Sequence, residues 1–139
     1  MTTSVTYIAP SEALQMMHDD PDALMVDVRT FAESVWVGVP DLSSVTSRDI
    51  PLIPWELVPG RSNPQFFDHI EAEAPNRDHA LIVFSRSGKR SGQAAAALVA
   101  HGYTNVYDMA DGFDGERNGD GRRSTINGWR ASGLPWFQQ

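Results

Sequence analysis

The sequence predicts an α/β fold in which a small, mostly parallel sheet is flanked by helices on both faces. The first observation behind this prediction is that short apolar segments alternate with helical patterns and are joined by short links. The second is that 139 residues, 41% of them hydrophobic and 21% charged, suit one compact globular unit. Because neither a repeat nor a boundary interrupts the pattern, we expect residues 1–139 to form a single domain.

The first third of the chain carries two candidate strands and two candidate helices. The β-prone stretch Val5–Ile8 is followed by Ser11, which is expected to cap a short helix through Met17. The apolar run Leu24–Val28 predicts a buried strand. Thr30–Trp36 then has room for one or two helical turns.

Two apolar segments in the middle of the chain differ in their prolines. Ile50–Trp55 contains two prolines, which lack the N–H that a central strand needs, so it is restricted to a short or edge strand. Ala80–Phe84 has no such interruption and is the strongest strand signal in the sequence. Between these segments, Pro64 suits the first position of a helix that runs to about Glu73.

The last third begins with a helix and ends in irregular chain. Ser91–Ala100 is alanine-rich and helical, with Gly102 placed to cap its C-terminal end. Thr104–Tyr107 predicts another short strand. Residues 111–121 are a Gly- and Asp-rich excursion, and residues 127–133 predict a last helical turn.

Charge and the lack of cysteine exclude several classes of function. The chain has 11 Lys and Arg residues against 18 Asp and Glu residues, a formal charge of −7. Such a surface repels phosphate backbones, so nucleic acid is not an expected partner. With no cysteine, the chain forms no disulfide, offers no thiolate ligand to a metal and has no thiol nucleophile.

Neither a metal, a cofactor nor a membrane is expected as a partner. The four histidines are scattered without metal-ligand spacing. Asp114-x-Glu116 resembles the start of a calcium loop, but Thr125 stands where such loops need a bidentate glutamate. No apolar run approaches the roughly 18 residues of a membrane span, and the first residues lack the basic and apolar segments of a secretory signal. We therefore expect a cytoplasmic protein.

The segment that carries the chemistry joins the strongest strand to the alanine-rich helix. In an open α/β sheet, ligands bind outside the carboxyl ends of the strands, and a helix start offers unpaired N–H groups and a positive dipole end. We therefore expect a small oxyanion, such as sulfate or phosphate, to bind this loop. The expected site has Ser85 at its base, surrounded by Arg86, Ser87, Gly88, Lys89, Arg90 and Ser91.

Other interpretations of this segment fit its residues less well. In a purely structural turn, acidic residues would suit the helix start better than the three basic residues present. A phosphate-binding P-loop needs a glycine five positions before Gly88 and a Ser or Thr after Lys89, and neither is present. A serine-hydrolase elbow needs glycines two positions before and after its serine, which Ser85, Ser87 and Ser91 lack.

The motifs resemble those of rhodanese-like domains over nearly the whole chain. The family's loop reads Cys-Arg-Ser-Gly-x-Arg-Ser, which residues 85–91 match after the first position, and its Asp-Val-Arg-Thr-x-x-Glu segment matches residues 27–33. Residues 102–107, 111–113 and 128–135 are similar to the family's C-terminal pattern. The resemblance implies the rhodanese fold and a sulfurtransferase activity. In active members the loop cysteine takes sulfur from thiosulfate or a similar donor, holds it as a persulfide and passes it to an acceptor.

The resemblance also implies that Asp27 and Arg29 lie at the end of a strand beside the loop. We expect a buried network of Asp27, Arg29 and Glu33 that fixes the strand–helix junction, because buried charges persist only when paired. The spacing of Arg29 and Glu33 is that of an i,i+4 ion pair. Direct contact with the substrate is the alternative role. Between Gly38 and Asp49 the family's usual Gly-His-x-Pro-Gly-Ala pattern is altered.

Ser85 departs from the family at the position of the nucleophile. A hydroxyl is far less acidic than a thiol, whose ordinary pKa is about 8.5, and an oxygen does not hold a persulfide. We therefore expect no sulfur transfer by this chain. Ser85 is either a substitution in an otherwise active sulfurtransferase or the natural residue of a non-catalytic module that binds an anion or a protein partner. The sequence does not identify a sulfur acceptor.

A relative of the Cdc25-type phosphatases is a third alternative. The six residues Ser85–Arg90 match the loop length of sulfurtransferases, whereas the loop of those phosphatases is longer. The loop length therefore favours the sulfurtransferase interpretation.

Overall fold

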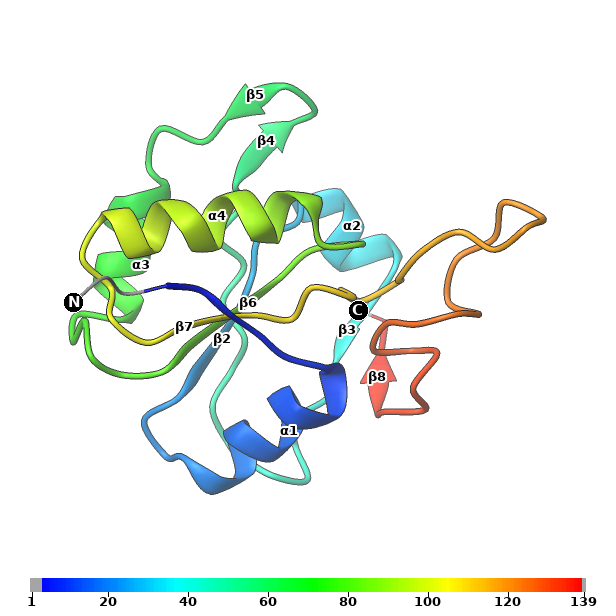
Figure 1. The fold of residues 1–139 in the computed structure, drawn as a ribbon, viewed down its shortest axis with the longest axis horizontal. Helices are drawn as coiled ribbons and strands as arrows, with labels where there is room; N and C mark the ends of the chain where they lie inside the picture. Colours follow the sequence, from blue (N-terminus) through cyan, green and yellow to red (C-terminus); the bar gives the residue numbers. More distant parts are fainter. Residues whose placement is uncertain (1–3, 139) are drawn as a thin grey trace.

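The computed structural model describes residues 4–138 and has a four-stranded parallel sheet in the order β1-β7-β6-β2. Its strands are β1 (Thr6–Tyr7), β2 (Leu24–Asp27), β6 (Leu81–Phe84) and β7 (Val106–Asp108). The helices are α1 (Pro10–Asp19), α2 (Phe31–Trp36), α3 (Phe66–Glu73) and α4 (Lys89–Ala100). Figure 1 shows α1 on one side of the sheet and α3 and α4 on the other. The predicted α/β class is confirmed.

Two hydrophobic clusters lie on opposite faces of the sheet because the side chains of a strand alternate between its faces. Ile82 and Phe84 of β6 belong to the cluster under α1, whereas Leu81 and Val83 belong to the cluster under α3 and α4. The helices complete the clusters with Ala13 and Met17 on one face, and Phe66, Ile70 and Leu98 on the other. Since both faces of β6 are covered, its sequence is an unbroken apolar run.

Two antiparallel strand pairs were not predicted. They are β3 (Val39–Pro40) with β8 (Trp136–Phe137), and β4 (Glu56–Val58) with β5 (Arg61–Ser62). The first pair joins segments almost 100 residues apart, so no local pattern indicates it. The proline-rich segment Ile50–Trp55 contributes a single parallel bridge, between Leu52 and Asp27, which agrees with the restriction that its prolines impose.

The start of α1 differs from the prediction that Ser11 caps it. The helix begins at Pro10, which occupies the first helical position, and Ala9 is the N-cap residue. The carboxylate of Glu12 accepts the N–H of Ala9 at 2.9 Å. Because Glu12 satisfies this free donor, Ser11 is not needed as a cap.

The start of α3 also lies later than predicted. Pro64 was expected at its first position, but the helix begins at Phe66. The side-chain oxygen of Asn63 accepts the N–H of Gln65 at 3.0 Å. This local hydrogen bond holds residues 63–65 as a turn, which delays the helix.

The Gly- and Asp-rich segment leads into an arm that projects from the body of the molecule, seen in orange in Figure 1. Asp114, at its base, forms an ion pair with Arg130 at 3.2 Å. The first carboxylate of the calcium-like pattern is therefore engaged with a cation. Arg123 donates from the arm to the carbonyl of Gly115 at 2.8 Å.

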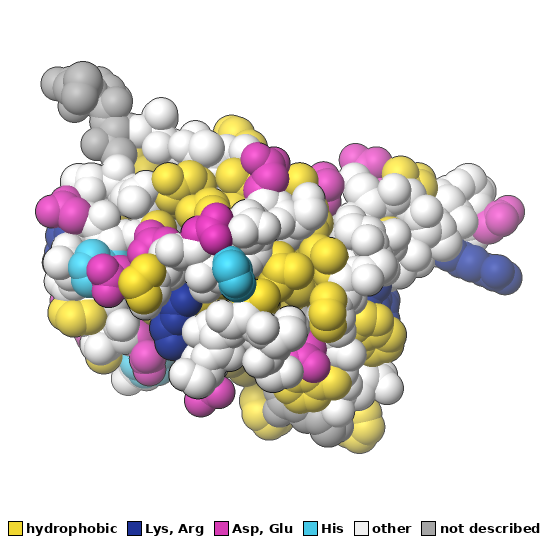
Figure 2. All heavy atoms as spheres, turned by 90° about the horizontal axis from the view of Figure 1, so that it is seen from below, with side chains coloured by type: hydrophobic (Ala, Val, Ile, Leu, Met, Phe, Trp, Pro, Cys, Tyr) yellow, Lys and Arg dark blue, Asp and Glu magenta, His cyan; other side chains and the backbone are white. Residues whose placement is uncertain are grey.

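The face of the molecule that carries α1 displays more acidic than basic side chains (Figure 2). This distribution agrees with the formal charge of −7. Within residues 4–138, no helix combines the length and the apolar character that crossing a bilayer requires.

Candidate functional site

The oxyanion loop, residues Ser85–Ser91, lies at the carboxyl end of β6, where the chain enters α4. The helix begins at Lys89, two residues before its predicted start, and Gly88 is its N-cap. Gly88 has a φ of 104°, a conformation that glycine adopts without strain. A Cβ at this position would overlap the carbonyl oxygen of Ala110, so the turn requires glycine.

Backbone hydrogen bonds hold one side of the oxyanion loop. The N–H groups of residues 113, 114 and 115 donate to the carbonyl oxygens of Ser85 and Arg86 at 2.9 to 3.1 Å. In a trans peptide unit the N–H points away from the C=O of the same unit. The N–H groups of Arg86 and Ser87 therefore point away from residues 113–115.

The base of the loop is formed by the hydroxyl of Ser85. This residue is fully buried, and its Oγ accepts the N–H groups of Gly88 and Ser91, both at 3.2 Å. Four other backbone N–H groups have no acceptor in the part of the chain that the structure describes; they belong to Arg86, Ser87, Lys89 and Arg90. Unpaired N–H groups at a helix start are the feature that favours anion binding.

A cavity of about 460 Å³, the loop cavity, opens in front of these residues. It is lined by Ser85, Arg86, Ser87, Lys89 and Arg90 of the loop, by Thr30 and Glu33, and by Glu56 and Pro59 of the β4–β5 hairpin. Gly88 and Ser91 do not line the cavity. Gly88 forms the turn before α4, and the N–H of Ser91 donates to Ser85 Oγ. Arg86 and Lys89 are exposed, and neither forms an ion pair within residues 4–138.

Arg90, by contrast, is neutralised by Glu33. Its Nη1 and Nη2 donate to the two carboxylate oxygens of Glu33 at 2.5 and 2.8 Å. Burial acts to raise the pKa of Glu33, but hydrogen bonds from Arg90 and Thr30 prevail and lower it to about 2. The expected Arg29–Glu33 pair is wrong, because Thr30 is the N-cap of α2 and Arg29 lies outside the helix.

Asp27 and Arg29 form the buried part of the expected network. Arg29 donates from Nε and Nη2 to the carboxylate of Asp27 at 2.9 and 2.7 Å, and from Nη2 to the carbonyl of Gly38 at 2.7 Å. Its guanidinium lies 5.3 and 4.9 Å from the ring centres of Phe84 and Phe113. Neither Asp27 nor Arg29 lines the loop cavity, which favours a structural role over direct contact with a ligand.

Asp108, which the sequence analysis did not single out, lies behind the oxyanion loop. The strand expected over Thr104–Tyr107 is β7, and it ends at Asp108. Burial raises the pKa of Asp108 to about 6, although the neighbouring Ser91 acts to lower it. A polar residue at the end of a third parallel strand is a signal that could have identified it, because all carboxyl ends meet at one edge of the sheet.

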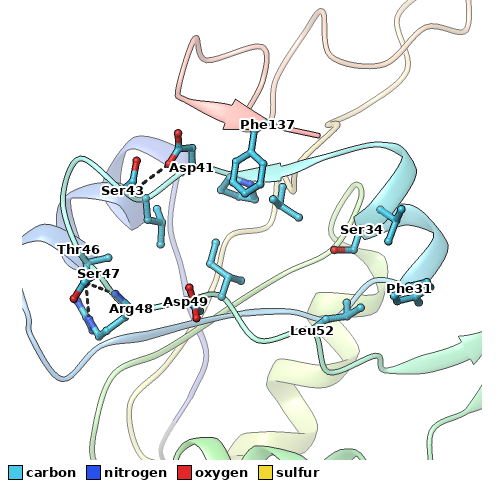
Figure 3. Close-up of a pocket in the computed structure, with 15 residues that line it drawn as sticks. Phe31, Ser34, Asp41, Ser43, Thr46, Ser47, Arg48, Asp49, Leu52 and Phe137 are labelled. Carbon is cyan, nitrogen blue, oxygen red and sulfur yellow. Dashed lines mark hydrogen bonds between the residues drawn. The ribbon is translucent and has the colours of Figure 1, made fainter. Parts of the chain in front are cut away.

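A second cavity, of about 540 Å³, lies on the other side of α2 (Figure 3). Phe31 and Ser34 of α2 line it, together with Asp41, Arg48 and Phe137. The guanidinium of Arg48 donates to three backbone carbonyls and to a threonine hydroxyl, so it offers no free cation. The second cavity therefore suits an oxyanion less well than the loop cavity does.

The loop cavity supplies donors but no activated nucleophile. The Oγ–H of Ser85 donates to the Oγ of Ser91 at 3.3 Å. Within residues 4–138, no carboxylate or imidazole hydrogen-bonds to the Ser85 hydroxyl. A nucleophilic serine needs an adjacent base. Free N–H groups with Arg86 and Lys89 around them are instead suited to hold an anion.

Comparison with known proteins agrees with this geometry. Residues 9–117 match the model of the rhodanese-like domain family. The crystal structure of Rv0390 from M. tuberculosis superimposes with a TM-score of 0.87, at 39% identity, over 99% of this chain and 100% of that one.

Two curated proteins with named activities are also similar. A sulfurtransferase of Allochromatium vinosum is 32% identical over 126 residues, which cover 90% of this chain and 89% of that protein. The thiosulfate:glutathione sulfurtransferase of Saccharomyces cerevisiae is 36% identical over 95 residues, which cover 63% of this chain and 59% of that protein.

Proposed function

Because this chain belongs to the rhodanese-like domain family, we propose that it is a thiosulfate-type sulfurtransferase domain with Ser85 at the nucleophile position. In this form it binds a small oxyanion and transfers no sulfur. The names of the similar proteins from Allochromatium and Saccharomyces support the sulfurtransferase class, and the second supports thiosulfate as the donor.

The observation that carries the proposal is the set of donors around the loop cavity. Four backbone N–H groups without acceptors adjoin the unpaired side chains of Arg86 and Lys89. Such donors match the oxygens of thiosulfate, sulfate or phosphate, which are all small tetrahedral anions. The rest of the chain is acidic, so this cavity is a local exception to the overall negative charge.

The absence of sulfur transfer follows from the chemistry of position 85. A cysteine there would attack the outer sulfur of thiosulfate as a thiolate, the S–S bond of the donor would break, and sulfite would leave with the bonding electrons. The two N–H groups that now point at Ser85 Oγ would stabilise that thiolate. A serine hydroxyl stays protonated at neutral pH without a base, so the first step does not occur.

Anion binding by the chain as it stands is tested by titration calorimetry with sulfate and thiosulfate. We expect both anions to bind at one site per chain, and Ser85→Ala to retain binding because the four free N–H groups remain. Absence of binding by either anion would overturn the oxyanion assignment.

The sulfurtransferase assignment is tested separately, by Ser85→Cys. We expect this variant to form thiocyanate from thiosulfate and cyanide, whereas the unmodified chain and Ser85→Ala do not. Ser85→Cys without activity, but with intact sulfate binding, would favour a non-catalytic anion- or protein-binding module. Hydrolysis of an aryl phosphate by the same variant would instead favour the phosphatase alternative. The cytoplasmic location stays a prediction.

A further inference from the structure

A buried carboxyl group lies directly behind the oxyanion loop. Asp108, the last residue of β7, is 1% exposed, and its Oδ1 has no hydrogen-bond partner within residues 4–138. Its Oδ2 lies against the first turn of α4, where a Cβ added to Gly92 would be 3.6 Å from it. An unpartnered carboxyl group in such a place costs free energy, so its presence needs an explanation.

Ser91 lies at the first turn of α4, beside Asp108 and next to the centre of the loop. The Ser91 hydroxyl donates to the carbonyl of Gly88 at 3.2 Å. Ser91 forms two hydrogen bonds with Ser85. Its N–H donates to Ser85 Oγ at 3.2 Å, and its Oγ accepts the Ser85 hydroxyl at 3.3 Å. Ser91 therefore lies between the carboxyl group of Asp108 and Ser85, which lines the loop cavity.

The groups packed around Asp108 supply no counter-charge. On α4 these are Ser91 and Gly92; on β6 the register partner is Val83; and on β1 it is Tyr7, whose phenol is 69% exposed. In the described part of the chain, no lysine, arginine or histidine contributes to the pKa of Asp108, and burial raises that pKa to about 6. The carboxyl group therefore changes its charge near neutral pH, beside the start of α4.

The ionised carboxylate and a bound anion compete for the same positive potential. Both lie near the N-terminus of α4, one behind the loop and one in front of it, and both are stabilised there by the helix dipole. Two negative charges so close, with little water between them, repel each other. When Asp108 is protonated this repulsion disappears, and the full positive potential of the helix start stabilises the bound anion.

We propose that Asp108 is the proton acceptor of the oxyanion loop: it takes up a proton whenever the loop holds negative charge. The proposal deepens the proposed function and rests on it. In the chain as it stands, sulfate binding then draws a proton onto Asp108. With cysteine at position 85, the thiol gives up its proton and Asp108 takes one up. That exchange leaves a thiolate and a neutral carboxylic acid, so charge and protons balance.

The first test compares the pH dependence of sulfate binding in the unmodified chain and in Asp108→Asn. Sulfate keeps its charge throughout this range, so any pH dependence belongs to the protein. From about pH 7.5 to about pH 5 we expect the affinity of the unmodified chain to rise roughly three- to tenfold more than that of Asp108→Asn. Asp68→Asn on the exposed face of α3 is the control, because it removes the same charge outside the lining of the loop cavity and should leave the pH dependence in place.

The outcomes of this test distinguish a failure of the proposed function from a failure of the role proposed for Asp108. No sulfate binding at any pH would overturn the proposed function itself. Sulfate binding with the same pH dependence in the unmodified chain and in Asp108→Asn would overturn the role of Asp108 alone.

A second measurement uses the unmodified chain, so it does not depend on whether a variant folds. Carbon NMR of the Asp108 carboxyl group in the unmodified chain reports its pKa with and without saturating sulfate. Linkage is reciprocal, so the pKa must rise by the logarithm of the ratio between the sulfate affinities of the protonated and ionised states. An unchanged pKa at saturation would overturn the proposal.

Discussion

The carboxyl ends of β2 and β7 each hold a buried acid, but their surroundings differ. Asp27 and Asp108 are both 1% exposed. Three hydrogen bonds from Arg29, two of them from its guanidinium, hold Asp27, whereas one oxygen of Asp108 has no partner in the part of the chain that the structure describes. The paired carboxylate fixes the chain around it. The unpaired one is free to change its charge, and it is the one that lies behind the oxyanion loop.

The basic residues of the loop show the same division. Arg90 is held by Glu33, and the pair joins α2 to the start of α4. Arg86 and Lys89 line the loop cavity without an ion pair in residues 4–138. Around the loop, the paired charges therefore belong to the scaffold, whereas the unpaired cations line the cavity where a ligand is expected.

Asp27→Asn is expected to have the largest effect, and it tests the buried ion pair between Asp27 and Arg29. It would leave the fully buried guanidinium of Arg29 without its counter-charge, which typically costs about 3–5 kcal/mol. We expect the free energy of unfolding, measured by urea denaturation, to fall by that amount. A loss below about 1 kcal/mol would show that the pair does not anchor the end of β2.

Asp108→Asn should raise the free energy of unfolding, whereas Asp27→Asn lowers it. Because the pKa of Asp108 is raised from 3.8 to about 6, the folded state binds its proton more tightly than the unfolded state does. The resulting cost is absent below about pH 4, grows between about pH 4 and pH 6, and is complete above that range. We expect Asp108→Asn to be more stable than the unmodified chain by about 2 kcal/mol near pH 8. Urea denaturation near pH 8 and near pH 4 should show this gain and then its loss; equal stabilities at pH 8 would contradict it.

Glu33→Gln separates stability from binding. Because the pKa of Glu33 is lowered to about 2, its contribution is complete above about pH 4.5 and is lost as the pH falls towards 2. Allowing for partial solvent screening, we expect the variant to lose about 1 kcal/mol of stability at neutral pH. Sulfate affinity should rise roughly twofold or more, because Arg90 becomes free to face the cavity. Denaturation and calorimetry of the same sample check both effects, and a weaker affinity would contradict the assignment of Arg90.

The unpaired cations should affect binding with little effect on stability. We expect Arg86→Ala and Lys89→Ala each to weaken sulfate binding by roughly two- to tenfold. Their free energies of unfolding should stay within about 0.5 kcal/mol of the unmodified chain, as for other exposed residues. Arg117→Ala on the projecting arm is the matched control, since it removes the same charge outside the cavity lining. Equal losses in all three variants would indicate a general charge effect rather than a site.

Much of the fold was predictable because its main strands are buried on both faces. Leu24–Val28 and Ala80–Phe84 are largely continuous apolar runs, and they form the neighbouring parallel strands β2 and β6. The β3–β8 pair was not predictable, because its partners are two residues long and distant in sequence. Helix starts were missed where a neighbouring side chain, such as Glu12 or Asn63, competed for the local N–H groups.

The position of the loop was predictable, but the partners of its side chains were not. Spacing suggested that Arg29 pairs with Glu33, yet Glu33 lies against Arg90, which is 57 residues further along the chain. The residue type of Asp108 did not distinguish it among the 18 acidic residues, and only its place at the end of a strand did. Its significance arises from the carboxyl ends of β6 and β7 lying side by side.

By itself, the order of apolar and small residues determined the α/β fold and placed a basic, glycine-containing turn at the end of its most buried strand. That information is local, since it depends on which residues a strand or a helix start can accommodate. The tertiary structure alone decided which charged side chains are neutralised by a partner and which are not. Pairing depends on distances between segments far apart in sequence, and burial, which gives an unpaired charge its free-energy cost, exists only once those segments have packed together.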